Sequence, residues 1–406
     1  MGAVPIPPGD EPGGIEIFTY LLTKYLASHM RVSVLDLSVG AQQSRMRLAS
    51  GATFYSIPRL PIPHSAVGKV KWQLMGRILR YILVMIHVVY FAFLSGLCLF
   101  KMLKSQRVDI IHTHSKEVAI AAFVFRRLAR SRAIMVHNSH AAVLLEKLDW
   151  KKRFMNILEF VAISKADHVF VDSQSVKEIL TLKFGYDGSR VSVLYGGGAY
   201  DDLQIVKARS SGLVRTPTKV LCVGSVNSRK NQLAAVRAIP AILQRVPGVH
   251  FVFAGPYIQD DYFNSIQCSI QSLGISKSVS FLGPVTASEL ESLYLTSGIF
   301  LFPSVAESQG TVIAEAAKFG LRIAASEIPP VREVSDLIPG SILTFNPYDP
   351  KSISENVVEL LRLSKVSQTK GEFDLVMNIF GWENISRRAE NLYGEILTLN
   401  GRPFRS

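Results

Sequence analysis

Two glutamates that lie eight residues apart, Glu307 and Glu315, bracket a glycine-containing turn. An apolar run ends at Phe302, a loop follows, and a helix is predicted to begin at Gly310. The first backbone N–H groups of a helix are unpaired and carry the positive end of its dipole, so Gly310 and Thr311 are predicted to hold a phosphate. A carboxylate can accept two hydroxyl groups at once, which suits the oxygens of a sugar or a ribose. The stretch therefore predicts an anion site between two hydroxyl-binding carboxylates.

Length and cysteine content narrow the class of protein. A chain of 406 residues is too long for one ordinary core, and we expect two domains. Cys98, Cys222 and Cys268 are far apart and lack the spacing of metal ligands, so neither a disulfide framework nor a zinc site is indicated. Such usage is typical of a reducing, cytoplasmic setting. The first fourteen residues lack the charged and apolar regions of a secretory signal.

The positive charge is concentrated in the first half of the chain. Residues 1–200 hold 25 Lys and Arg against 13 Asp and Glu, whereas residues 201–406 hold 20 against 19. No zinc finger, RNP-like aromatic motif or basic helix with heptads supports nucleic acid as the partner. We therefore favour an anionic membrane surface.

Residues 81–100 form an apolar run without a formal charge, long enough to span a bilayer. A transmembrane helix would place residues 32–37 and 108–112, which both resemble strands of one sheet, on opposite sides of a membrane. A fully buried crossover helix is a second interpretation, although an entirely apolar circumference is unusual for a helix that covers a sheet. We favour a third, in which one face packs on the sheet and the other enters the membrane interface.

Short apolar strands alternate with amphipathic helices along the chain. This order predicts an α/β fold of two doubly wound, Rossmann-like domains, each with a parallel sheet covered on both faces. We expect strands at 32–37, 108–114, 133–136, 168–172 and 191–194, and then at 219–223, 250–254, 279–282, 299–302, 322–325 and 342–345.

Four histidines follow two of the predicted strands: His112, His114, His137 and His140. The carboxyl ends of parallel strands are where open α/β sheets bind ligands. Most such histidines cap strands or bond to neighbouring loops, so we assign chemistry to at most one of the four.

A series of segments in fixed order resembles the motifs of the retaining GT-B glycosyltransferases of family 4. The two glutamates stand in the pattern Pro-Ser-x-x-Glu-x7-Glu-Ala. The other matching segments are Gly-Gly-x-Glu at 13–16, Asp-Ile-Ile-His-x-His at 109–114, Ala-Asp-x-Val at 166–169, Val-Gly-Ser to Lys-Asn at 223–231, Phe-Leu-Gly at 281–283 and Gly-Trp-Glu at 381–383. Paired glutamates alone are common on helices, but this ordered set covers nearly the whole chain.

The resemblance implies a GT-B fold, in which two domains face a central cleft. Residues 1–200 would bind the acceptor, residues 201–380 would bind the nucleotide sugar, and the helix in residues 381–406 would pack back on the first domain. Glu315 would hold the ribose hydroxyls and Glu307 a hydroxyl of the donor sugar. Lys230, helped by Arg229, would neutralise the charge that grows on the leaving nucleoside diphosphate.

The remaining roles implied by the resemblance fall mainly on the backbone. They are the amides of Gly310 and Thr311 on the diphosphate, the backbone of Leu282 and Gly283 on the base, Gly13 and Gly14 close to the diphosphate or acceptor, and His140 on the donor sugar.

The sequence departs from the family pattern at four places, one of which is Gly255-Pro256-Tyr257 in place of a Gly-Asp-Gly-Pro turn. Ser225 stands where the family has arginine, so that phosphate contact falls to Arg229 or is absent. Ser308-Gln309 replaces Gly-Phe, a change that bears on contacts with the donor sugar. Residues 197–200 replace Asn-Gly-Val-Asp before the second domain. No Asp-x-Asp motif occurs, so we expect neither a metal nor another cofactor to hold the diphosphate.

We therefore expect a retaining hexosyltransferase that uses a UDP- or GDP-sugar and acts on a lipid-linked or membrane-borne glycan. It would be cytoplasmic and peripheral at the cytosolic face of the membrane, without nucleic acid as a partner. Two alternatives remain: another GT-B enzyme, such as an epimerase or a phosphorylase, and an inactive membrane-associated scaffold of the same fold.

Overall fold

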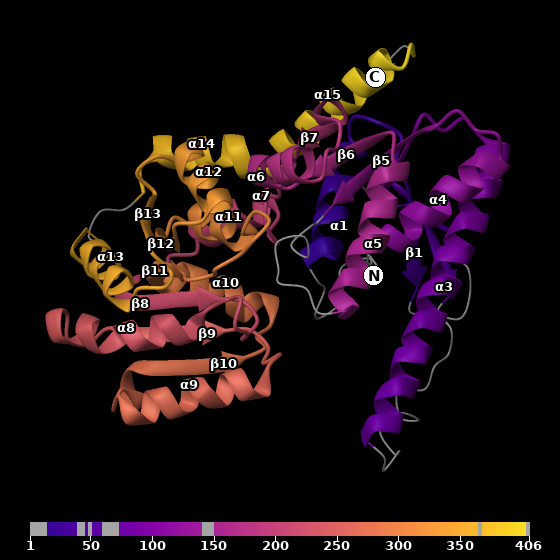
Figure 1. Cartoon of the computed structure of the whole chain (residues 1–406). Helices are drawn as coiled ribbons and strands as arrows, with labels where there is room; N and C mark the ends of the chain where they lie inside the picture. The colour runs from indigo at the N-terminus through magenta and orange to yellow at the C-terminus, as the bar shows by residue number, and fades with distance from the viewer. Residues whose placement is uncertain are drawn as a thin grey trace. The chain divides into compact units, whose positions relative to one another are not determined.

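The computed structural model describes residues 14–38, 45–47, 51–58, 73–139, 150–363 and 368–402 (Figure 1). The chain divides into two compact units. Unit 1 comprises residues 1–171, 180–194 and 386–406, and unit 2 comprises residues 172–179 and 195–385. Helix α15 (Trp382–Leu399) therefore begins in unit 2 and continues in unit 1.

Unit 2 is built on one parallel sheet of six strands in the order β10-β9-β8-β11-β12-β13. Every strand comes from an apolar segment that the sequence predicted. Their bounds are β8 (Thr216–Val223), β9 (His250–Ala254), β10 (Val279–Gly283), β11 (Ser297–Phe302), β12 (Arg322–Ser326) and β13 (Ile342–Phe345). The central strand β11 is buried along its whole length, as expected for a sheet with both faces covered.

Helices cover both faces of this sheet and bury a separate apolar cluster on each. One cluster takes residues from α8 (Gln232–Arg245), α9 (Asp260–Ser272) and α13 (Pro350–Leu363). The other takes residues from α7 (Asp202–Arg209), α10 (Ala287–Thr296), α11 (Thr311–Lys318), α12 (Pro329–Leu337) and α14 (Lys370–Phe380). Unit 2 is thus a doubly wound, Rossmann-like domain, as predicted.

Unit 1 contains two sheets among its described residues. Parallel strands β4 (Ile110–Thr113), β5 (Ile134–Ser139), β6 (His168–Val171) and β7 (Val191–Val193) form one sheet in chain order. The other has the order β1-β3-β2, with β1 (Ser33–Ser38) parallel to β3 (Thr53–Pro58) and β2 (Arg45–Arg47) antiparallel to it. The sequence analysis missed β2 and β3.

The expectation that residues 32–37 and 108–112 lie in one sheet was wrong for the described strands. Strands β1 and β4 belong to different sheets, and both line a cavity of about 930 Å³. The rest of its wall includes residues of helix α1 (Gly14–Leu26), helix α3 (Gln73–Ser105) and helix α4 (Lys116–Leu128), together with Tyr393 and Leu397 of α15. Paired strands lie about 4.8 Å apart, whereas β1 and β4 both line this cavity and form no ladder with each other.

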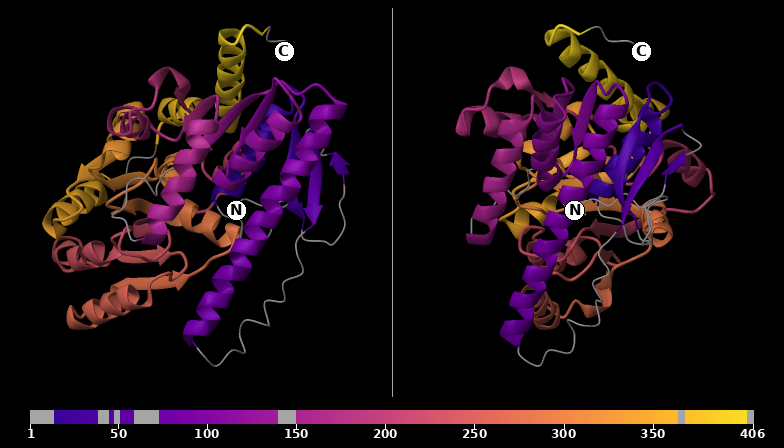
Figure 2. Two further views of the ribbon diagram at one scale, coloured as in Figure 1. Left: turned by 45° about the vertical axis from the view of Figure 1, so that its right-hand side comes forward. Right: turned by 90° about the vertical axis from the view of Figure 1, so that its right-hand side faces the viewer.

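The apolar run at 81–100 lies inside the 33-residue helix α3. Helix α3 lies alongside α4 (Lys116–Leu128), as Figure 2 shows. The contact is close at Gly96, where an added Cβ would lie 2.1 Å from the ring of Phe125, so this crossing requires glycine. Phe93 and Phe125 meet edge to face, with ring centroids 5.9 Å apart.

Helix starts in unit 2 follow local capping chemistry. The cap of α10 is Thr286. The Thr286 side chain accepts from the Glu289 amide and the Glu289 side chain accepts from the Thr286 amide, a reciprocal capping box. Asp201 caps α7 by accepting from the Leu203 amide.

Candidate functional site

Three charged side chains meet at the carboxyl edge of the unit 2 sheet. Glu307, in the loop after β11, pairs with Lys230 at 2.6 Å through Oε1 and with Arg229 at 2.7 Å through Oε2. The Glu307 side chain is 9% exposed, that of Lys230 14% and that of Arg229 26%. Burial alone would raise the pKa of Glu307, but the two cations outweigh it and the pKa lies below its ordinary value. The cluster holds two positive charges against one negative charge.

The loop that carries the two cations is fixed by its asparagines. The Lys230 amide donates to Asn227 Oδ1 at 3.1 Å. Asn231 has a positive φ of 55°, and its side chain donates to the carbonyl oxygens of Pro303 and Pro347. The Val305 amide donates to the Arg229 carbonyl at 2.9 Å, so the loop after β8 is joined to the loop after β11. These bonds hold the cations beside Glu307.

The amino terminus of α11 lies next to this cluster. Gly310 adopts the left-handed conformation, with φ of 83°, and Thr311 is the first residue of the helix. An added Cβ at Gly310 would lie 3.1 Å from the Phe302 ring, and Lys230 Nζ lies 5.2 Å from the centroid of the same ring. Within the described part of the chain, no side chain caps α11. A helix dipole and two cations therefore favour an anion at the same place.

Glu315 lies inside unit 2 and is 4% exposed. The Tyr294 hydroxyl donates to Oε2 at 2.8 Å and the Ala199 amide donates to Oε1 at 2.8 Å. Burial raises the pKa of this carboxyl, and the two donors lower it by a smaller amount. Gly198 passes so close that an added Cβ would lie 2.3 Å from Glu315 Cγ. The carboxylate thus holds the start of unit 2 in place, and its contact with a ribose remains a prediction.

Gln309 is the feature whose position the sequence did not predict. Its side chain is buried and pairs with the backbone of Gly196: the Gly196 amide donates to Oε1 at 2.6 Å, and Nε2 donates to the Gly196 carbonyl at 3.0 Å. The Gln309 amide is bonded to the segment before α7, and the effect of Ser308-Gln309 on contacts with the donor sugar stays a prediction. A side-chain amide carries a donor and an acceptor, so it can bond to both backbone groups of one residue as a neighbouring strand would. The two residues are far apart in the chain, so no local sequence pattern indicates this pairing.

Ser225, Leu282 and Gly283 lie at the ends of β8 and β10 in the same unit. The Ser225 carbonyl accepts from the side chains of Asn227 and Gln232. The Leu282 side chain is 46% exposed, and Gly283 has a φ of 70°. The structure therefore brings together, at one sheet edge, the predicted base-binding residues and the predicted phosphate-binding residues.

The predicted site residues of unit 1 are only partly described. Gly14 is the first residue of α1, and a Cβ added to it would meet nothing within 4 Å. Gly13 and His140 lie outside the described residues. His112 Nδ1 lies 2.6 Å from the Tyr393 hydroxyl, so this histidine bonds to α15.

His137 belongs to a buried polar network at the end of β5 that includes Glu159 of α5 (Trp150–Lys165), a residue not singled out from the sequence. Thr113 Oγ1 lies 3.0 Å from His137 Nδ1, and His137 Nε2 lies 3.4 Å from Glu159 Oε1. The Ser139 hydroxyl donates to the same Glu159 oxygen at 2.6 Å. Burial alone would raise the pKa of Glu159, but these partners, His137 first, leave the pKa below its ordinary value. His137 is thus a structural member of the network.

Among the described residues, no group of three or more His, Cys, Asp or Glu side chains is arranged to hold a metal ion. One described helical segment, Val88–Ser105, has the length and mean hydropathy, 1.5, of a membrane span, and 22% of it is buried.

The chain matches two family models and many solved structures. Residues 12–197 match the model described as Glycosyltransferase Family 4, and residues 205–372 match Glycosyl transferases group 1. An uncharacterized glycosyltransferase of Methanocaldococcus jannaschii is 24% identical, over 73% of this chain and 77% of its own length. The gpi3 subunit of phosphatidylinositol N-acetylglucosaminyltransferase from Schizosaccharomyces pombe is 23% identical over 60% of this chain, which spans about half (52%) of that relative.

The structural comparisons support the same fold. Sucrose-phosphate synthase from Thermosynechococcus elongatus has a TM-score of 0.68 at 18% identity, over 96% of this chain and 94% of its own. Anabaena HepE in complex with UDP and glucose has a TM-score of 0.67 at 16% identity, over 95% and 97% of the two chains. The two family models together cover most of the chain, and both units have the Rossmann-like sheets of these structures. The chain is a GT-B glycosyltransferase that belongs to family 4.

Proposed function

We propose that this chain transfers a sugar from a UDP- or GDP-sugar to a membrane-borne glycan or lipid-linked acceptor, with retention of configuration at the anomeric carbon. The observation that carries the proposal is the cluster of Lys230, Arg229 and Glu307 at the amino terminus of α11. Two cations and a helix dipole suit a diphosphate, and the UDP complex of the HepE structure, a protein of the same fold, agrees with that choice.

In the proposed reaction, the bond between the anomeric carbon and the diphosphate oxygen breaks, and the acceptor oxygen bonds to the same face of that carbon. The acceptor proton passes to an oxygen of the departing diphosphate. Lys230, Arg229 and the amides at Gly310 and Thr311 stabilise the negative charge as it grows, so neither a metal nor another cofactor is needed. Glu307 holds both cations in position and binds a hydroxyl of the donor sugar.

The nucleoside part would lie along the same edge of the sheet. The backbone at Leu282 and Gly283 contacts the base, and Glu315 is the residue proposed for the ribose. Glu315 already accepts hydrogen bonds from Tyr294 and Ala199. The ribose hydroxyls would therefore donate to the remaining lone pairs of this carboxylate, or Ala199 would shift to free one of its oxygens.

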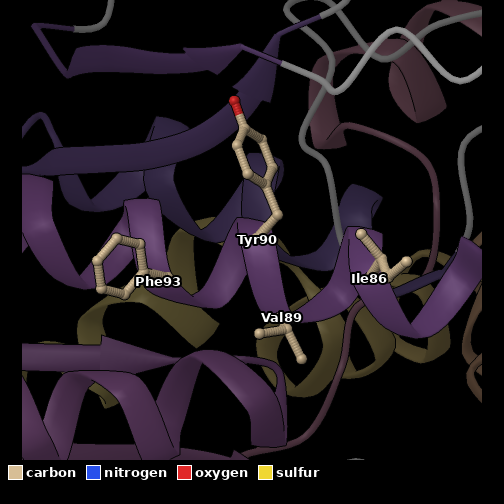
Figure 3. A pocket seen from close by; sticks show the side chains of 4 residues that line it. All are labelled: Ile86, Val89, Tyr90 and Phe93. Carbon is tan, nitrogen blue, oxygen red and sulfur yellow. The ribbon is translucent and has the colours of Figure 1, made fainter.

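The proposed acceptor is membrane-borne because α3 presents an exposed apolar stripe. Ile86 is 50% exposed, Val89 62% and Phe93 53%, and Figure 3 shows them with Tyr90 along one side of the helix. The opposite side is buried, with Phe91 3% and Ser95 2% exposed. Large exposed side chains at such spacing suit the interface of a membrane. The excess of basic residues in the first half of the chain favours an anionic, cytosolic leaflet.

The transfer is tested by incubating the chain with UDP- and GDP-sugars and measuring the free nucleotide. We expect release to accelerate when lipid-linked acceptor in vesicles is added and to persist in EDTA. Equal release without acceptor would favour an epimerase or another acceptor-independent enzyme. No binding of any nucleotide sugar would favour the inactive scaffold.

The membrane contact is tested by liposome flotation with anionic and neutral vesicles. We expect Val89→Asp combined with Phe93→Asp to abolish flotation on anionic vesicles, whereas Leu399→Asp, at a residue of α15 that is 80% exposed, is the control and should float as the wild type does. Flotation of the double variant at the wild-type level would refute the assignment of the stripe.

A further inference from the structure

The loop after β9 carries an exposed aromatic ring at the edge of the sheet where the nucleotide is proposed to bind. Tyr257 is 39% exposed. Its ring stacks on Phe263 of α9, with centroids 4.1 Å apart and planes inclined by 20°. Its hydroxyl donates to the Phe281 carbonyl of β10 at 3.3 Å. The ring is therefore fixed at its base and at its tip while a large part of it faces solvent.

The backbone around Tyr257 is tied to the loop that carries the cations. The Val226 amide donates to the Pro256 carbonyl at 2.8 Å, and the Ile258 amide donates to the Val226 carbonyl at 3.3 Å. These two bonds form a parallel bridge between Val226 and Tyr257. Lys230 lies four residues after Val226, so these bonds tie the backbone at Tyr257 to the loop that carries Lys230.

Tyr257 is equally close to the predicted base-binding backbone. A Cβ added to Gly283 would lie 3.6 Å from the Tyr257 hydroxyl and 3.7 Å from its ring. The neighbouring side chains Leu282 and Ile258 are 46% and 63% exposed. Three exposed apolar side chains thus surround the ends of β9 and β10, where α/β sheets bind their ligands. A planar, partly apolar ligand would cover them.

We infer that Tyr257 is a stacking platform for the base of the donor nucleotide, a role that rests on the function proposed above. A base against the Leu282–Gly283 backbone has the Tyr257 ring beside it, while its diphosphate reaches Lys230 and α11. The ring recognises an aromatic heterocycle by its face, so it adds affinity for a nucleotide over a bare diphosphate. The contact between Tyr257 and Phe263 holds the platform in position before the ligand arrives.

The test compares binding of UDP, GDP and ADP with binding of inorganic pyrophosphate by calorimetry. We expect Tyr257→Ala to weaken the nucleotide that the wild type prefers by roughly 5- to 150-fold and to leave pyrophosphate affinity unchanged. Tyr257→Phe keeps the ring and should bind both ligands as the wild type does. The matched control is Tyr348→Ala, at a tyrosine of the same unit that is 77% exposed.

A second readout follows the ring itself. In Tyr257→Trp, we expect the nucleotide to quench the new indole fluorescence and pyrophosphate not to do so. Unchanged nucleotide affinity in Tyr257→Ala, or an equal loss of nucleotide and pyrophosphate affinity, would overturn the inference while the proposed transfer stands. Failure of the wild type to bind any nucleotide would instead refute the proposed function.

Discussion

Replacing Glu307 by glutamine should destabilise the free protein and increase the stabilisation that a bound diphosphate provides. Glu307→Gln keeps the shape of the side chain and removes its charge. Lys230 and Arg229, which share this carboxylate at 2.6 and 2.7 Å, would then face each other without a counter-ion. A ligand with two phosphates can supply the missing charge, so the loss is expected in the free protein and is offset in the complex.

The magnitude follows from burial of the cluster. Breaking a buried ion pair by removing one partner costs about 3–5 kcal/mol, and the partial exposure of Arg229, 26%, places this change near the lower end, about 3 kcal/mol. Unit 2 has about 200 residues, and for that size 1 kcal/mol shifts the melting temperature by about 2–4 °C. We therefore expect the melting temperature to fall by about 6–12 °C.

The assay is thermal unfolding with and without inorganic pyrophosphate. The control is Glu355→Gln, which removes an exposed partner of Lys351 at 3.9 Å and should cost at most about 1 kcal/mol. We expect pyrophosphate to raise the melting temperature of Glu307→Gln more than that of the wild type. The reasoning is refuted if Glu307→Gln melts like Glu355→Gln, or if pyrophosphate stabilises Glu307→Gln and the wild type equally.

Three further outcomes follow from buried polar contacts. Lys318 is fully buried and pairs with Asp202 at 3.2 Å, so Lys318→Met should lower the free energy of unfolding in urea by about 3 kcal/mol, and adding Asp202→Asn should restore most of it. Gln309→Ala removes two hydrogen bonds to Gly196 and should cost about 1–3 kcal/mol, with faster hydrogen exchange at the Gly196 amide. Because the pKa of Glu307 is lowered from 4.5, the stability that its charge adds is fully present above pH 4.5 and is lost as pH falls through the lowered pKa. Melting curves of the wild type and Glu307→Gln should therefore converge only below pH 4.5.

The sequence predicted the sheet of unit 2 well because each strand is a short apolar run between clear breaks. The strands β9 and β13 have the predicted bounds, 250–254 and 342–345. In unit 1 the prediction was weaker, because β2 has only three residues, and β3, with the sequence TFYSIP, mixes apolar with polar residues and ends in proline. The separation of β1 from β4 depends on tertiary packing, which no local pattern reports.

Helix α3 is longer than the charge-free run from which it was predicted. The run at 81–100 ends where charges begin, but the helix continues from Gln73 to Ser105 because charged residues are good helix formers. The sequence favoured a helix with one packed and one exposed face. It could not indicate which residues make the packing contact, because Gly96 packs against Phe125, a residue of another helix.

For the charged cluster, too, the sequence indicated the individual residues but not their pairing. Local patterns indicated Lys230 and Glu307 separately, as parts of a loop and of a strand–turn–helix element. Their pairing joins residues 77 positions apart, and the bonds between Gln309 and Gly196 join residues 113 positions apart. For Lys230 and Glu307, the sheet order, which places β8 beside β11, brings the two segments together.

The central claim is that Lys230 and its neighbours bind the diphosphate of a nucleotide donor, and calorimetric titration with UDP, GDP and ADP tests it most directly. We predict that the wild type binds at least one of them and that Lys230→Ala lowers that affinity by at least about tenfold, the loss of one charge-assisted contact. Wild-type affinity in Lys230→Ala would contradict the account.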